Sequence, residues 1–239
     1  MTKFLSVYPL LFGILVCNVS HLQAQEQIIG VERTVVRVGD FDPDKVYDKN
    51  TGEKISKNKV IKLLREKPNQ PLEEIYDKAG KIYRYLYDAN NHATVIVPDR
   101  NAKAKKGEVF PEFLFKTSTG LQINSDDLAG KILLLRFLGD AEDFNLKMDE
   151  IIELNEKIEN SPHKENIEAF ILFNNDLSSI EKIFTLKNSN FKIIPDAYNF
   201  HRKFHVSRMP TTLVLKSGMI VEDWYNYSED IDLETVFED

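Results

Sequence analysis

The chain has 239 residues, of which 42% are hydrophobic and 29% are charged, and its formal net charge is −7. This composition is typical of a folded globular protein and excludes a disordered chain. Nucleic acid is not expected as a partner, because an acidic chain lacks the broad basic face that phosphate binding requires.

The first 25 residues have the pattern of a secretory signal peptide. Lys3 supplies a positive charge near the start, residues 4–17 are apolar, and Ala24 and Gln25 lead into a polar segment. The apolar stretch is too short for a transmembrane helix. We therefore expect residues 1–25 to be removed and the mature chain to be exported, to a periplasmic or extracellular location.

The only cysteine of the chain, Cys17, lies inside this apolar stretch. The mature chain would therefore contain no thiol, and without a thiolate neither disulfide exchange nor peroxide reduction by cysteine can occur. An alternative is that Cys17 is a lipid-attachment site. Val16 disfavours that alternative, because such processing normally requires a small residue before the cysteine.

Residues 26–98 are predicted to form a small α+β unit, for which no family is recognised. Ser56 is a candidate N-cap for its helix, and the turn at residues 77–80 separates two strand-like segments. The predicted elements are a strand over 31–38, a helix over 57–65, a hairpin of 72–76 and 81–87, and a strand over 94–97.

Residues 99–107 are polar and show no periodicity, which predicts a linker. The basic cluster at 103–106 is short. We interpret it as part of a solvated linker and not as an anion site.

Residues 108–239 alternate strand-like and helix-like segments, which predicts a mixed sheet covered by helices. Residues 132–138 are apolar without alternation, as in a central strand that is buried on both faces. The later predicted elements are a helix over 144–158, a strand over 166–174, a helix ending at 186 that Asp176 or Ser178 would cap, a strand over 191–194, a helix over 197–204, a hairpin of 211–215 and 220–227, and a helix over 230–237.

Several landmarks occur in a fixed order in this second part. The segment GEVFPEF lies at 107–113, LAGK at 128–131 precedes the apolar run, and MPTTLVL at 209–215 is followed by Ser217 and Gly218. In this order the landmarks resemble the TlpA/ResA and AhpC/TSA branch of the thioredoxin-like superfamily. The resemblance covers somewhat more than half of the chain and implies an α/β fold, a thioredoxin-like mixed sheet flanked by helices over residues 108–239.

In that branch a C-x-x-C redox motif follows the central strand, whereas here the segment is GDAEDFN at 139–145. On the family pattern, Glu142 falls at the place of the attacking cysteine and Asn145 at the place of the resolving one. The resemblance therefore implies a redox motif that has lost both cysteines. A label of thiol-disulfide oxidoreductase would then be inherited from relatives without describing the chemistry of this chain.

The resemblance also implies that the Met209–Pro210 bond is cis, that it faces the redox loop, and that the backbone of Met209 can pair with an extended peptide. We therefore take Met209, Pro210, Asp140, Glu142 and Asn145 as a candidate surface for binding a polypeptide or a neighbouring envelope protein. The alternative is that Pro210 serves the turn and Met209 only packs in the core.

Two other readings of polar residues are open. The acidic loop of Asp140, Glu142 and Asp143 could serve a cysteine-independent hydrolytic or metal-assisted enzyme, although acidic residues at a helix start commonly act only as caps. His201 and His205, four residues apart, would share a face of a helix, but two ligands do not complete a metal site. No cofactor or metal is expected. A purely structural role is a third possibility.

Overall fold

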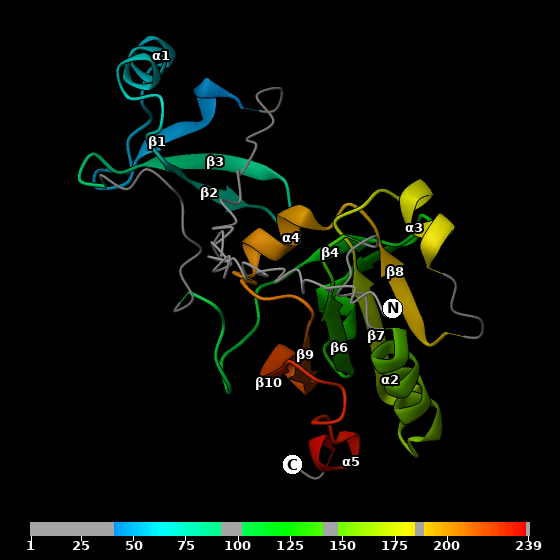
Figure 1. Cartoon of the computed structure of the whole chain (residues 1–239). Helices are drawn as coiled ribbons and strands as arrows, with labels where there is room; N and C mark the ends of the chain where they lie inside the picture. The colour runs from blue at the N-terminus through cyan, green and yellow to red at the C-terminus, as the bar shows by residue number, and fades with distance from the viewer. Residues whose placement is uncertain (1–40, 92–101, 141–147, 185–188, 238–239) are drawn as a thin grey trace, which may run out of the picture. The chain divides into compact units, whose positions relative to one another are not determined.

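The computed structural model describes residues 41–91, 102–140, 148–184 and 189–237 (Figure 1). Residues Asp42–Asp239 form one compact unit. The expected signal peptide, the expected strands at 31–38 and 94–97, and the expected helix start at 144 lie outside the described residues. None of the described helices is both long enough and apolar enough to span a bilayer.

The central sheet has five strands in the order β10-β9-β6-β7-β8. The strands β6 (Ile132–Phe137), β7 (Ile167–Leu172) and β8 (Phe191–Ile194) are parallel to one another. On the other side of β6, β9 (Thr211–Lys216) runs antiparallel to it, and β10 (Ile220–Tyr225) runs antiparallel to β9. The predicted mixed sheet is confirmed.

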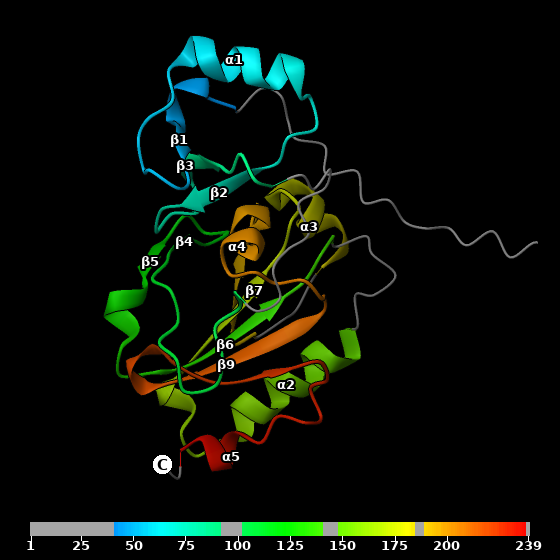
Figure 2. The ribbon, with the colours of Figure 1, turned by 90° about the vertical axis from the view of Figure 1, so that its left-hand side faces the viewer.

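Helices cover both faces of this sheet (Figure 2). One face packs against α2 (Met148–Asn160), α3 (Leu177–Ile183) and α5 (Leu233–Val236). The other face packs against α4 (Tyr198–Lys203) and against the hairpin of β4 (Leu114–Lys116) and β5 (Gln122–Asn124). The last helix is shorter than predicted, because Asp232 caps it by accepting a hydrogen bond from the Glu234 backbone N–H at 3.0 Å.

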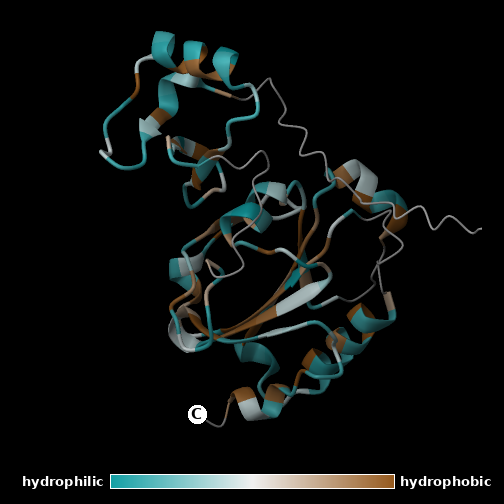
Figure 3. Cartoon of the chain, turned by 60° about the vertical axis from the view of Figure 1, so that its left-hand side comes forward, coloured by the Kyte–Doolittle hydropathy of each residue, from teal (hydrophilic) through white to brown (hydrophobic). Residues whose placement is uncertain are grey.

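Every residue of β6 is buried, as the unbroken apolar run predicts. Leu133, Leu135 and Phe137 pack into the core under α4, whereas Ile132 and Leu134 pack into the core under α2. In Figure 3 the central strands are brown over most of their length, while the helices are brown on part of each turn only. Two hydrophobic cores therefore share one strand.

Arg136 is the single charged residue of this strand, and its side chain has no exposed surface. Its Nη1 donates to Thr212 Oγ1 on β9 at 2.9 Å, and its Nη2 forms an ion pair with Glu150 in the first turn of α2. Burial lowers the pKa of the guanidinium, and the hydrogen bond that Arg136 donates to Glu150 opposes that shift. The Arg136 side chain thus joins β6 to α2 by an ion pair and to β9 by a hydrogen bond.

The described part of the N-terminal unit is a three-stranded sheet with one helix. Its elements are β1 (Val46–Asp48), α1 (Lys57–Glu66), β2 (Leu72–Tyr76) and β3 (Ile82–Tyr87), with the strand order β1-β3-β2. The predicted helix and hairpin are confirmed, but β1 was not predicted, because three residues show no periodicity. Ser56 stands at the N-cap position, yet its side chain makes no capping hydrogen bond.

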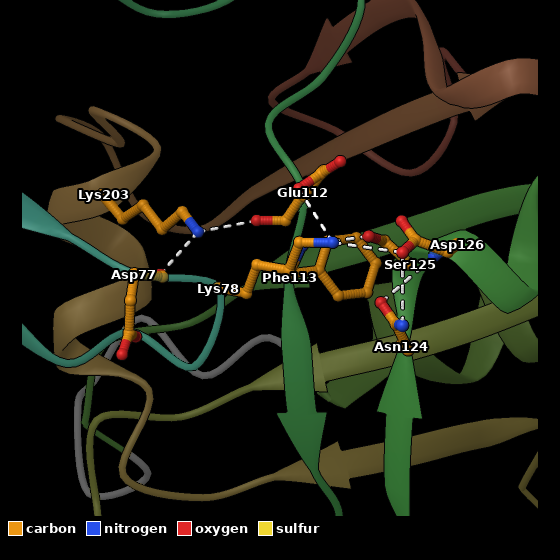
Figure 4. A network of polar contacts seen from close by, with 8 residues as sticks. All are labelled: Asp77, Lys78, Glu112, Phe113, Asn124, Ser125, Asp126 and Lys203. Carbon is orange, nitrogen blue, oxygen red and sulfur yellow. Dashed lines mark hydrogen bonds and ion pairs between the residues drawn. The ribbon is translucent and has the colours of Figure 1, made fainter.

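Backbone and charged groups connect this unit to the segments beside the central sheet (Figure 4). Lys203 Nζ, from α4, donates to the carbonyl oxygens of Asp77 at 2.7 Å and Glu112 at 2.6 Å. Lys78 forms ion pairs with Glu112 at 2.9 Å and Asp126 at 3.1 Å. The turn between β2 and β3 is thus held against α4 and the segment that leads into β4.

Two further contacts hold the hairpin that contains this turn. Arg202 Nε lies 2.7 Å from Glu74 Oε2 and donates to the Tyr76 hydroxyl at 3.0 Å. Gly80 has a φ of +73°, and a Cβ there would lie 3.2 Å from the ring of Phe200. A glycine is needed at this position for its backbone conformation and for the close approach of the ring.

The Arg136–Glu150 pair gives a test of the core. We expect Glu150→Gln to lower the free energy of unfolding by about 3 kcal/mol, because it leaves a buried cation without its carboxylate. Urea denaturation would measure the loss. Glu156→Gln, at an exposed position of the same helix, is the control and should change stability by less than about 0.5 kcal/mol.

The double variant Arg136→Leu with Glu150→Gln should recover much of that loss, since it removes the buried charge together with its partner. Equal effects of the Glu150 and Glu156 substitutions would contradict this account of the ion pair.

Candidate functional site

The pairing of β6 with β9 places the candidate surface. Phe137, the last residue of β6, pairs with Thr211, the first residue of β9, and the two strands are antiparallel. The residues before Thr211 therefore lie beside the residues that follow Phe137. These residues are Met209 and Pro210 on one side and the segment that reaches Asp140 on the other.

Met209 and Pro210 are both partly exposed. The peptide bond between them is cis. Met209 also packs against the hydrophobic core under α4. Both interpretations of Met209 in the sequence, a contact for a bound chain and a packing residue, are compatible with a side chain that lies half in the core.

The acidic segment is only partly described. Asp140 is exposed at the end of the β6 region, whereas Glu142 and Asn145 lie outside the described residues. No group of three potential metal-ligating side chains occurs within the described ranges. The proposed alignment of Glu142 and Asn145 with the lost cysteines therefore stays a prediction.

The expectation for His201 and His205 was wrong in its geometry. The helix α4 ends at Lys203, and His205 lies beyond it with a φ of +54°, so the two imidazoles do not share a helical face. His201 is buried, and its ring centroid lies 5.5 Å from that of Phe137. Burial lowers the pKa of His201 to about 4. A hydrogen-bonding interaction with the Leu172 backbone opposes this shift in part. His201 is a neutral core residue at physiological pH.

A cavity of about 560 Å³ opens beside the Met209–Pro210 bond. Its described lining comes from three segments that are distant in sequence. They are Lys103, residues 206–208 with Thr211, and Trp224 with Asn226. Trp224 Nε1 donates to the Ala104 carbonyl at 2.9 Å, and the Trp224 ring stacks on Phe137 with centroids 5.8 Å apart. One wall of the cavity is therefore fixed to the end of β6.

The interpretation of the 103–106 cluster as wholly solvated was wrong for its first two residues. Lys103 is partly buried with its Nζ 3.9 Å from the centroid of the Trp224 ring, and Ala104 accepts the hydrogen bond of that indole. Lys105 and Lys106 are exposed, as expected. One signal for this position was visible in the sequence, since Trp224 is the single tryptophan of the chain.

In the strand order β10-β9-β6-β7-β8, β9 alone runs in the opposite direction, antiparallel to both of its neighbours. The cis Pro210 directly precedes β9. The fold is thioredoxin-like. The resemblance recognised in the sequence is confirmed at the level of the fold.

Solved structures of low sequence identity are similar to this chain. The thioredoxin domain of a thiol-disulfide oxidoreductase from Bacteroides vulgatus matches 54% of this chain and 93% of its own, at 15% identity and a TM-score of 0.43. For StoA from Bacillus subtilis the match covers 54% of this chain and 97% of StoA, at 17% identity and a TM-score of 0.41. A thiol:disulfide interchange protein from a Bacteroides species matches 52% and 82%, at 14% identity and a TM-score of 0.41.

No family model and no curated protein matches the sequence. At the identities and TM-scores above, the similar structures say nothing about the activity of this chain. The thioredoxin-like assignment rests on the strand order and directions.

The burial of His201 gives a prediction for acid stability. The folded pKa of about 4 lies below the ordinary value of 6.5, so as the pH falls the unfolded chain takes up this proton first. The free energy of unfolding should therefore fall between pH 6.5 and about pH 4, by roughly 3 kcal/mol from this group.

We expect His201→Leu to remove this component, measured by urea denaturation at a series of pH values. His163→Gln, at an exposed position, is the control and should leave the wild-type profile in place. An unchanged acid dependence in His201→Leu would show that other groups cause it.

Proposed function

We propose that this chain is a redox-inactive thioredoxin-like protein that binds a polypeptide, such as a neighbouring envelope protein, over the surface around Met209, Pro210 and residues 140–145. The observation that carries the proposal is the absence of any cysteine other than Cys17 from the sequence. A single thiol cannot form the intramolecular disulfide of a dithiol catalyst.

The proposal includes export and a division of the chain. Residues 1–25 would be a signal peptide, and their removal would take Cys17 with them. Residues 26–98 would form the N-terminal unit, 99–107 the linker and 108–239 the thioredoxin-like domain. The N-terminal unit would contribute to the partner surface, a role supported by its contacts with α4 through Lys203 and Arg202.

The geometry that supports binding is the position of Met209 and Pro210 beside the end of β6. Ser207 and Arg208 immediately before them are exposed, and the cavity of about 560 Å³ is next to them. A thioether is soft and adaptable, and an exposed backbone can pair with an extended peptide. These groups are available for binding without any thiol.

The first test concerns redox activity. We expect the purified chain to leave the reduction of insulin disulfides by dithiothreitol at its uncatalysed rate. Cys17→Ser should behave identically, because no dithiol cycle is possible in either protein. Insulin precipitation is the measurement, with a dithiol thioredoxin as the positive control. Turnover above the uncatalysed rate by either protein would refute redox inactivity.

The second test locates polypeptide binding. A photoreactive benzoylphenylalanine at Ser207 should become crosslinked to biotinylated octapeptides with randomised central positions, and the labelling should saturate with peptide concentration. The same probe at Ile152 is the control, because Ile152 is 41% exposed on α2, which covers the opposite face of the sheet.

Adding Met209→Asp to the Ser207 probe should weaken labelling, since a carboxylate replaces the apolar thioether. Equal labelling at positions 207 and 152 would refute binding at this surface.

A further inference from the structure

The cavity beside Met209 and Pro210 has a charge opposite to that of the whole chain. Of the described residues that line it, two are charged, and both are cations: Lys103 and Arg208. The chain as a whole has a net charge of −7. The positive charge of this cavity therefore differs in sign from the net charge of the chain, and two cations at one cavity favour the binding of an anion.

Neither cation is neutralised within the described part of the chain. Lys106 and Lys216 both form ion pairs with Glu222, at 2.7 Å and 3.1 Å, but no ion pair with a described carboxylate is made by Lys103 or Arg208. Asp223 attracts Lys103 electrostatically, and its Oδ1 accepts the Trp224 backbone N–H at 2.7 Å. The cavity thus keeps positive charge that an incoming group can use.

Lys103 is held in position and partly desolvated. Its ammonium lies 3.9 Å from the centroid of the Trp224 ring, and the hydrogen bond from Trp224 to Ala104 fixes the neighbouring backbone. Burial lowers the pKa of Lys103. A cation that has already lost water gains more from an anion than a fully hydrated one, because less solvent has to be displaced.

The remaining lining groups suit a carboxylate. The guanidinium of Arg208 can donate two parallel hydrogen bonds to a carboxylate, and Lys103 adds a point charge. Ser207 and Asn226 are exposed at the cavity and can donate hydrogen bonds. Ser207 and Arg208 also directly precede Met209, so a chain bound at Met209 passes the cavity.

We propose that this cavity holds the carboxylate of an aspartate or glutamate side chain belonging to the polypeptide that Met209 and Pro210 receive. The inference rests on the proposed function and adds the class of partner, an acidic polypeptide segment. Trp224 lines the cavity and is the only tryptophan of the chain, so its fluorescence reports occupancy directly.

The experiment titrates the purified full chain with three octapeptide pools, acetylated and amidated at their ends, that carry a central Glu, Gln or Lys among randomised positions. We expect the Glu pool to change the Trp224 emission with a dissociation constant at least about fivefold lower than that of the Gln pool. Raising the salt concentration from 50 to 500 mM should weaken the Glu pool selectively, because salt screens the charge interaction.

Variants assign the preference to the two cations. Arg208→Gln, which leaves the Lys103–Trp224 contact in place, should reduce the Glu preference, and Lys103→Gln should do the same. Lys103→Arg should restore it. Lys105→Gln is the matched control, because Lys105 is exposed two residues away and is absent from the described lining. Circular dichroism of each variant checks that the fold is retained.

The outcomes separate the two proposals. Equal binding of the Glu and Gln pools, or a Glu preference that survives both Arg208→Gln and Lys103→Gln, overturns the carboxylate inference and leaves polypeptide binding standing. Binding of free N-acetylglutamate amide as tight as that of the Glu pool shows that the cavity selects a small acid and overturns the peptide assignment. Failure of all three pools to bind refutes the inference and the proposed function together.

Discussion

The structure depends on one strand that is buried on both faces. β6 contributes alternate side chains to two separate hydrophobic cores. The helices on both faces of the sheet therefore pack into cores that contain side chains of this one strand. Hydrophobic burial has no direction, and it does not by itself fix which neighbours the strand takes. Arg136 adds direction, because its guanidinium must meet Thr212 on β9 and Glu150 on α2. A displaced neighbour would leave a charge buried without its partner.

The same strand determines where the candidate surface lies. Because Phe137 pairs with Thr211, the end of β6 and the turn before β9 must be adjacent. Met209 and Pro210 are therefore presented beside the segment that begins at Gly139. This arrangement follows from backbone pairing and does not require a cysteine. Under the proposed function, the loss of the redox motif would remove the chemistry and leave this surface for a bound chain.

Long-range contacts also decide which polar groups are available at that surface. The indole of Trp224 stacks on Phe137 and donates to Ala104, so a segment from the predicted linker becomes one wall of the cavity. Lys103 is placed over that ring, and Arg208 comes from the turn before β9. Lys106 and Lys216, by contrast, are both paired with Glu222. Among the described lining residues of the cavity, the charged ones are therefore both cations.

The sequence by itself determined those helices and strands whose hydrophobic pattern is local and extends over enough residues to be recognised. The apolar run of β6, the one-sided helix α1 and the hairpin of β2 and β3 follow from periodicity and turn residues within about ten neighbours. The presence of a single cysteine, Cys17, which excludes an intramolecular disulfide, was also visible there. The three-residue strands β1, β4 and β5 were not predicted, because so short a segment is stabilised only by its partner strand.

Tertiary structure alone decided the burial of Arg136, the burial of His201 and the position of Lys103 over Trp224. Each depends on residues that are far away in the sequence, and a local pattern carries no information about such partners.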